Sequence, residues 1–141
     1  MFKFGAFASG GGSNFRSLLS HAEDGTLEGS CEFLIVNNAD CGAAQSAKEH
    51  GIPVYHISSK THPNEADYEQ ALLNVLEELP VDLVALCGYM KKIPDSFLDK
   101  MKDRVLNVHP ALLPKYGGKG FYGIRVHQAV IAAGEKESGP T

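Results

Sequence analysis

The stretch Val81-Asp82-Leu83-Val84-Ala85-Leu86-Cys87 is apolar at every position except Asp82. Such a run is typical of a strand that is buried on both faces of a parallel sheet. A helical pattern precedes it, because Asn64 is a good N-cap and apolar residues then recur at helical spacing until Pro80. The stretch therefore predicts a buried strand that follows a helix.

The same alternation extends in both directions from this strand. Toward the C-terminus, Pro94 can begin a helix that runs to about Lys102, and residues 104–108 predict a further strand. Toward the N-terminus, strands are expected over residues 2–8, 32–37 and 54–57, and helices over residues 15–22 and 42–50. This order predicts a doubly wound α/β fold with a mostly parallel, Rossmann-like sheet.

The length of 141 residues predicts one domain, because it suffices for one core and falls short of two. A last helix is expected from about Ile124 to Ala133, ending at Gly134, and a polar tail follows it. A helix after a parallel strand normally returns the chain to another strand. We therefore expect residues 1–141 to form a single domain that is truncated and lacks its C-terminal strands and helix.

Composition excludes several classes of protein. No apolar run approaches the roughly 18 residues of a membrane span, and residues 1–5 show no secretory signal, so a cytoplasmic location is expected. The net charge of -4 provides no basic surface for nucleic acid. The three cysteines form no CxxC pair, which argues against a disulfide framework and a metal site. Cys31 and Cys87 are expected in the core.

Two glycine-containing loops follow predicted strands. Ser9-Gly10-Gly11-Gly12-Ser13-Asn14 joins a strand to a helix, where glycines and free amides suit a phosphate. A tight turn with Ser13 as a simple cap is the alternative for this loop. Gly88-Tyr89-Met90-Lys91-Lys92-Ile93 follows the buried strand, and its backbone could bind a flat heterocycle between apolar walls. An ordinary loop with two solvated lysines is the alternative here.

Asn107 and His109 stand two residues apart where the last predicted strand ends before Pro110. Residues i and i+2 of a strand project from the same face, so both side chains can enter one cleft. An amide donor and an imidazole are the groups that stabilise a tetrahedral oxyanion at a carbonyl or formyl carbon. A structural histidine is the alternative for His109 alone. The absence of a GxSxG motif disfavours covalent catalysis.

Together, residues 9–14, 88–93 and 107–116 resemble the phosphoribosylglycinamide formyltransferase family of folate-dependent enzymes, over the whole chain. The resemblance implies transfer of the formyl group of 10-formyltetrahydrofolate to the amine of glycinamide ribonucleotide in purine biosynthesis, without a metal. It implies that the substrate phosphate and ribose are bound by Gly12, Ser13 and Asn14. It implies that the folate is bound by Met90, Lys91, Lys92 and Ile93, and that Asn107 and His109 are catalytic.

The resemblance also sets expectations for the partners and for the missing part of the site. The family's catalytic aspartate would lie beyond Thr141, and residues 117–123 would form a mobile lid. The expected partners are the two small-molecule substrates, with no nucleic acid or membrane, in a monomer or a homodimer. Alternatives are methionyl-tRNA formyltransferase, for which a further domain and a basic surface are expected, and formyltetrahydrofolate hydrolase, for which a regulatory domain ahead of residue 1 is expected. A non-catalytic nucleotide-binding module is the alternative from another class.

Overall fold

The computed structural model describes residues 2–107, 128 and 131–134. The chain divides into two compact units, Met1–Leu106 and Asn107–Thr141, and each is described by itself. In the second unit, Gly134 has a φ of 69°, and its N–H donates to the Ile131 carbonyl at 3.0 Å. The predicted start of the last helix and the predicted lid at residues 117–123 lie outside the described residues.

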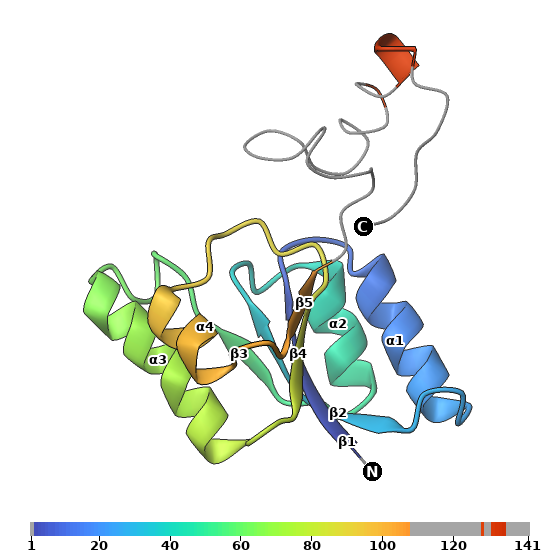
Figure 1. The fold of residues 1–141 in the computed structure, drawn as a ribbon, viewed down its shortest axis with the longest axis horizontal. Helices are drawn as coiled ribbons and strands as arrows, with labels where there is room; N and C mark the ends of the chain where they lie inside the picture. Colours follow the sequence, from blue (N-terminus) through green and yellow to red (C-terminus); the bar gives the residue numbers. More distant parts are fainter. Residues whose placement is uncertain (1, 108–127, 129–130, 135–141) are drawn as a thin grey trace. The chain divides into compact units, whose positions relative to one another are not determined.

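Helices and strands alternate along the chain, as the sequence predicted (Figure 1). Within residues 2–107, five strands form one sheet in the order β3-β2-β1-β4-β5, and β1 pairs in parallel with both β2 and β4. The elements are β1 (Phe2–Ala8), α1 (Ser13–Glu23), β2 (Gly29–Val36), α2 (Gly42–Glu49), β3 (Val54–His56), α3 (Glu65–Glu78), β4 (Leu83–Leu86), α4 (Asp95–Lys100) and β5 (Val105–Asn107).

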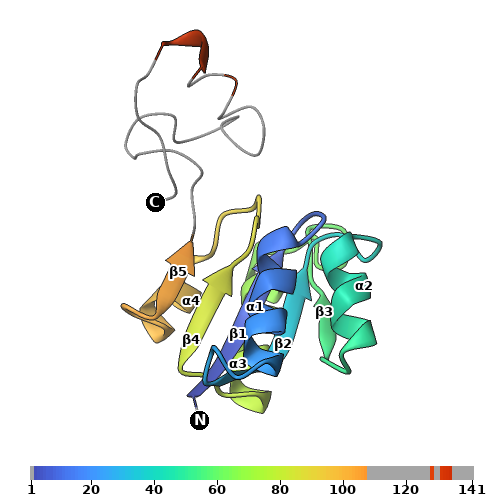
Figure 2. The same ribbon diagram turned by 90° about the vertical axis from the view of Figure 1, so that its right-hand side faces the viewer.

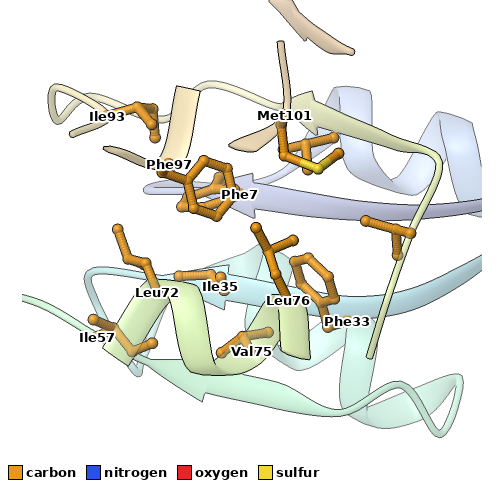
Figure 3. Close-up of a cluster of buried hydrophobic side chains, with 12 residues drawn as sticks. Phe7, Phe33, Ile35, Ile57, Leu72, Val75, Leu76, Ile93, Phe97 and Met101 are labelled. Carbon is orange, nitrogen blue, oxygen red and sulfur yellow. The ribbon is translucent and has the colours of Figure 1, made fainter. Parts of the chain in front are cut away.

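The helices cover both faces of the sheet, which confirms the doubly wound α/β prediction (Figure 2). One core lies between the sheet and α3 and α4, where Phe7 of β1 meets Phe97 edge-on with ring centroids 5.3 Å apart (Figure 3). The other core lies under α1 and α2 and contains the buried Phe15 and Leu19. Because the chain changes faces after β3, the switch point of the sheet falls between β1 and β4.

Strand β1 approaches β2 very closely at Gly5. A Cβ atom placed on Gly5 would lie 2.1 Å from Cζ of Phe33. The pairing register skips one residue here, since Phe4 pairs with Cys31 whereas Gly5 pairs with Phe33. The irregularity increases local twist and lets the Phe33 ring cover the bare glycine backbone.

Two helix starts differ in their caps. The Asn64 side chain accepts from Ala66 N at 2.8 Å and Asp67 N at 3.4 Å, which confirms the predicted cap of α3. Helix α1 begins after Gly12, which has no side chain to cap it. The alternative in which Ser13 caps α1 is therefore wrong, because Ser13 is already the first helical residue.

Several predicted boundaries need correction. Strand β2 begins at Gly29, three residues before the predicted start, and Pro94 is the N-cap of α4 instead of its first residue. Helix α4 ends at Lys100. Strand β4 spans only Leu83–Leu86, and Val84 alone among its residues is buried, whereas burial on both faces was predicted for the whole stretch.

The cysteines are distributed differently from the prediction. Cys87 is buried, as expected, but Cys31 is only partly buried and Cys41 is buried instead. Burial raises the pKa of the Cys31 thiol to about 12 and that of the Cys87 thiol to about 11. Both thiols are therefore protonated near neutral pH and poorly reactive.

Membrane spans and metal clusters are both absent from the described part of the chain. No described helix is long and apolar enough to cross a membrane. Within residues 2–107, 128 and 131–134, no group of three or more His, Cys, Asp or Glu side chains could hold a metal ion.

Candidate functional site

The loop after β1 reaches α1 through a left-handed glycine. Gly12 has a φ of 74°, and a Cβ atom there would lie 2.6 Å from Cβ of Ala43. The backbone conformation and the contact with α2 both require glycine. Ser13 and Asn14, the first residues of α1, are exposed. The N–H groups of this first turn have no side-chain cap, which leaves them free for an anion.

Helix α2 and Arg16 hold this loop in place. The N–H of Ala43 donates to the Gly10 carbonyl at 3.2 Å. The Arg16 guanidinium donates to the Gly11 carbonyl, and the Arg16 N–H donates to the Gly12 carbonyl at 2.8 Å. These contacts leave a fixed loop that carries the positive end of a helix dipole and an adjacent arginine.

The loop after β4 is fixed by its aromatic residue. Tyr89 packs edge-on against Phe7 with ring centroids 5.0 Å apart. The hydroxyls of Tyr89 and Tyr68 of α3 lie 2.7 Å apart and share a hydrogen bond. Burial raises the pKa of the Tyr89 hydroxyl well above its ordinary value, and the bond to Tyr68 acts in the same direction. The Tyr89 hydroxyl is therefore protonated at physiological pH.

A single hydrogen bond joins the two loops. The N–H of Met90 donates to Oγ of Ser9 at 2.9 Å, although the two residues are 81 positions apart in the sequence. Both loops lie at the carboxyl edge of the sheet, beside the switch point (Figure 2). Ligands of open α/β sheets bind at this place.

Two cavities of about 460 and 470 Å³ lie farther along the same edge, after β2 and β3. Both are lined by Asn37, Ser58, Ser59 and Lys91. Oδ1 of Asn37 is buried and accepts no hydrogen bond within the described residues. Neither Asn37 nor Ser58 was predicted as a site residue. Asn37 is the last residue of the strand predicted over 32–37 and Ser58 follows the strand predicted over 54–57, and this place at the carboxyl ends of parallel strands was a usable signal.

The predicted folate residues fall into two groups. Met90, Lys91 and Lys92 are exposed, with 52% of Met90 accessible, and the two lysines line the first cavity. Ile93 is 6% exposed and belongs to the core beneath α3 and α4, where it offers a ligand little surface. Asn107 is exposed at the end of β5, and His109 lies outside the described residues.

Comparison with known proteins decides the family. The family model described as "Formyl transferase" matches residues 2–141. This chain belongs to the formyl transferase family. The two loops at the switch point therefore belong to a formyl transferase fold.

Relatives within the formyl transferase family cover nearly all of this chain. The chloroplastic phosphoribosylglycinamide formyltransferase of Arabidopsis thaliana is 45% identical over 140 residues, which are 99% of this chain and 48% of that protein. The phosphoribosylglycinamide formyltransferase of Bacillus subtilis (strain 168) is 33% identical over 134 residues, which are 95% of this chain and 69% of that protein. The chain spans about half the length of the plant relatives that it matches.

A solved structure gives the same result for the fold. The crystal structure of glycinamide ribonucleotide transformylase 1 from Geobacillus kaustophilus superimposes with a TM-score of 0.89 at 31% identity. The superposition covers all of this formyl transferase chain and 72% of the other. The Rossmann-like formyltransferase architecture predicted from the sequence is thereby confirmed.

Proposed function

We propose that this chain transfers the formyl group of 10-formyltetrahydrofolate to the amine of glycinamide ribonucleotide, a step of purine biosynthesis. The observation that carries the proposal is the hydrogen bond between Met90 and Ser9. In this member of the formyl transferase family, the bond joins the loop after β1, which suits a phosphate, to the loop after β4, which suits a second ligand. A two-substrate transfer needs two such sites side by side, since the reacting atoms must meet.

The acceptor's phosphate and ribose are assigned to Gly12, Ser13 and Asn14. The uncapped N–H groups of α1 supply donors, and the helix dipole favours an anion. Arg16 adds a permanent positive charge beside the same loop. These features suit a phosphate monoester better than a neutral group.

The donor is assigned to the loop after β4. The backbone of Met90 to Ile93 would bind the edge of the pterin, and Met90 would supply an apolar wall. Lys91 and Lys92 are exposed beside a cavity of about 460 Å³, where their charges suit the carboxylates of a folate. The buried position of Ile93 limits its part to support of the loop from the core.

The chemistry is assigned to Asn107 and His109. The acceptor's amine nitrogen forms a bond to the formyl carbon, and the carbonyl electron pair moves onto oxygen. The Asn107 amide and the His109 imidazole would donate hydrogen bonds to that oxygen as it becomes anionic. On collapse, the bond between carbon and N10 breaks, N10 takes a proton, and the former amine loses one. The products are formylglycinamide ribonucleotide and tetrahydrofolate.

The remaining proposals concern organisation. Residues 1–141 would form a single formyltransferase domain, acting on two small molecules without nucleic acid or a membrane. A cytoplasmic location and a monomeric or homodimeric state remain part of the proposal. Cell fractionation with an antibody to this chain, and sedimentation of the purified chain, would check these two points.

Calorimetric titration of the folded chain with glycinamide ribonucleotide tests the acceptor site. We expect saturable binding at one site, and at least a tenfold loss of affinity in Ser13→Asp, because a carboxylate would occupy the place of the phosphate. Ser17→Asp is the matched control, since it adds the same charge to an exposed position one turn farther along α1. A folded wild-type chain that did not bind, or a control that lost affinity equally, would contradict the acceptor assignment.

A formyl-transfer assay tests the reaction itself. We expect His109→Ala to lower turnover far more than it weakens binding of either substrate, because its donor acts on charge that develops during reaction. Unchanged turnover in this variant would show that the catalytic assignment is wrong. Binding of both substrates by the wild-type chain without turnover would favour the non-catalytic nucleotide-binding module.

A further inference from the structure

We infer that Ser9 is a positioning residue that fixes the donor-binding loop through the Met90 N–H. The inference rests on the proposed function, because it concerns the loop assigned above to the folate. Ser9 stands at the end of the central strand β1, and Oγ accepts from Met90 N at 2.9 Å. It would not touch either substrate and would act only through the backbone that it holds.

The loop after β4 depends on this hydrogen bond at Met90. Its beginning is held by β1, since Cys87 N donates to the Phe7 carbonyl at 2.8 Å, and the partly buried Tyr89 packs against Phe7 and bonds Tyr68. After Met90 come two exposed lysines, and the chain returns to the core only at Ile93. The Ser9 bond therefore holds the backbone at the residue where the proposed donor-binding segment starts.

The loop after β1 is held in place by contacts that do not involve the Ser9 hydroxyl. Ala43 N donates to the Gly10 carbonyl, Arg16 donates to the Gly11 carbonyl, and Gly12 lies against Ala43. Removal of the hydroxyl leaves these three contacts in place. Loss of the Ser9 bond should therefore affect the donor site and spare the acceptor site.

This asymmetry separates positioning from a general structural role. A general loss of packing would weaken both sites together. A local loss at Met90 would weaken donor binding alone, and a variant that keeps the hydroxyl would restore it. Net contributions of single hydrogen bonds correspond to a loss of affinity of about three- to tenfold.

Calorimetric titrations with tetrahydrofolate and with glycinamide ribonucleotide test the inference on the purified chain. Ser9→Ala should weaken tetrahydrofolate binding about three- to tenfold and change glycinamide ribonucleotide binding less than about twofold. Ser9→Thr keeps the acceptor oxygen and should bind tetrahydrofolate within about twofold of wild type. Ser17→Ala, on the exposed surface of α1, is the matched control and should bind both ligands as wild type does.

Amide hydrogen exchange supplies a readout that needs no ligand. The Met90 amide should exchange faster in Ser9→Ala than in wild type or in Ser9→Thr, while the amide of Ala43 keeps its rate. An unchanged Met90 rate, equal weakening of both ligands, or a Thr variant that behaves like the Ala variant would overturn the inference. A wild-type chain that bound neither ligand would instead overturn the proposed function, and this inference with it.

Discussion

Replacement of Gly12 by alanine should destabilise the fold far more than the same change at the neighbouring Gly11. Gly12 has a φ of 74°, and its added Cβ atom would lie 2.6 Å from Cβ and 2.8 Å from Cα of Ala43. Gly11 has no such backbone constraint and no atom within 4 Å of an added Cβ atom. The two variants therefore make one chemical change in one loop with different physical consequences.

The expected magnitude for Gly12→Ala has two parts. The left-handed backbone costs an L-residue about 1–2 kcal/mol. Insertion of a methyl group into the contact with α2 costs a further amount of about 1–3 kcal/mol. The free energy of unfolding should fall by about 2–5 kcal/mol, which in a chain of this size lowers Tm by roughly 6–15 °C. Gly11→Ala should change the free energy of unfolding by less than about 0.5 kcal/mol.

Denaturant unfolding followed by far-ultraviolet circular dichroism measures these two variants together with Ala43→Gly and a double variant. Ala43→Gly removes the Cβ atom nearest to the inserted methyl group, so the double variant Gly12→Ala/Ala43→Gly should show a favourable coupling energy of about 1 kcal/mol. The reasoning would be refuted if Gly12→Ala and Gly11→Ala unfolded at the same denaturant concentration. It would also be refuted, as regards the contact, if the two changes in the double variant were simply additive.

Three further predictions concern stability. Gly5→Ala should lower the free energy of unfolding by about 3 kcal/mol, because its Cβ atom would lie 2.1 Å from the Phe33 ring; urea unfolding measures this, and an unchanged midpoint would contradict it. Burial raises the pKa of Cys87 from 9.0 to about 11, so the native state keeps the proton longer than the unfolded state. Tm should therefore hold below pH 9 and decline as the pH rises toward 11, less steeply in Cys87→Ala; equal slopes in the two proteins would count against this assignment. Asp103 has a φ of 61°, so Asp103→Gly should raise the free energy of unfolding by up to about 1 kcal/mol in thermal melts, and a lowered Tm would disprove the relief of strain.

The order of elements could be predicted because each left a local signal. Asn64 caps α3 through its own side chain, so four consecutive residues contain the evidence for that helix start. The early start of β2 could not be predicted in the same way. Gly29 and Ser30 have low strand propensity, and they join the sheet because β1 lies beside them.

The site could be predicted in its parts but not in its assembly. The glycine loop and the loop after β4 are each visible as short motifs that follow apolar runs. The bond between Ser9 and Met90 joins residues 81 positions apart, and no local pattern encodes that distance. The contact of Gly12 with Ala43 likewise depends on how α2 packs beside the loop, which the sequence of the loop does not contain.

The central place of β1 has a consequence for synthesis on the ribosome. This strand is made before the other four described strands, yet one of its two neighbours is β4, and the contact between Lys3 and Asp82 joins residues 79 positions apart. At about 5–20 residues per second, β1 waits roughly 4–16 s for that neighbour to be translated. During this interval its apolar edge can meet another nascent chain. Strand β1 thus precedes the other described strands in synthesis but is enclosed only after β4 emerges, and until then its open edge exposes the nascent chain to aggregation.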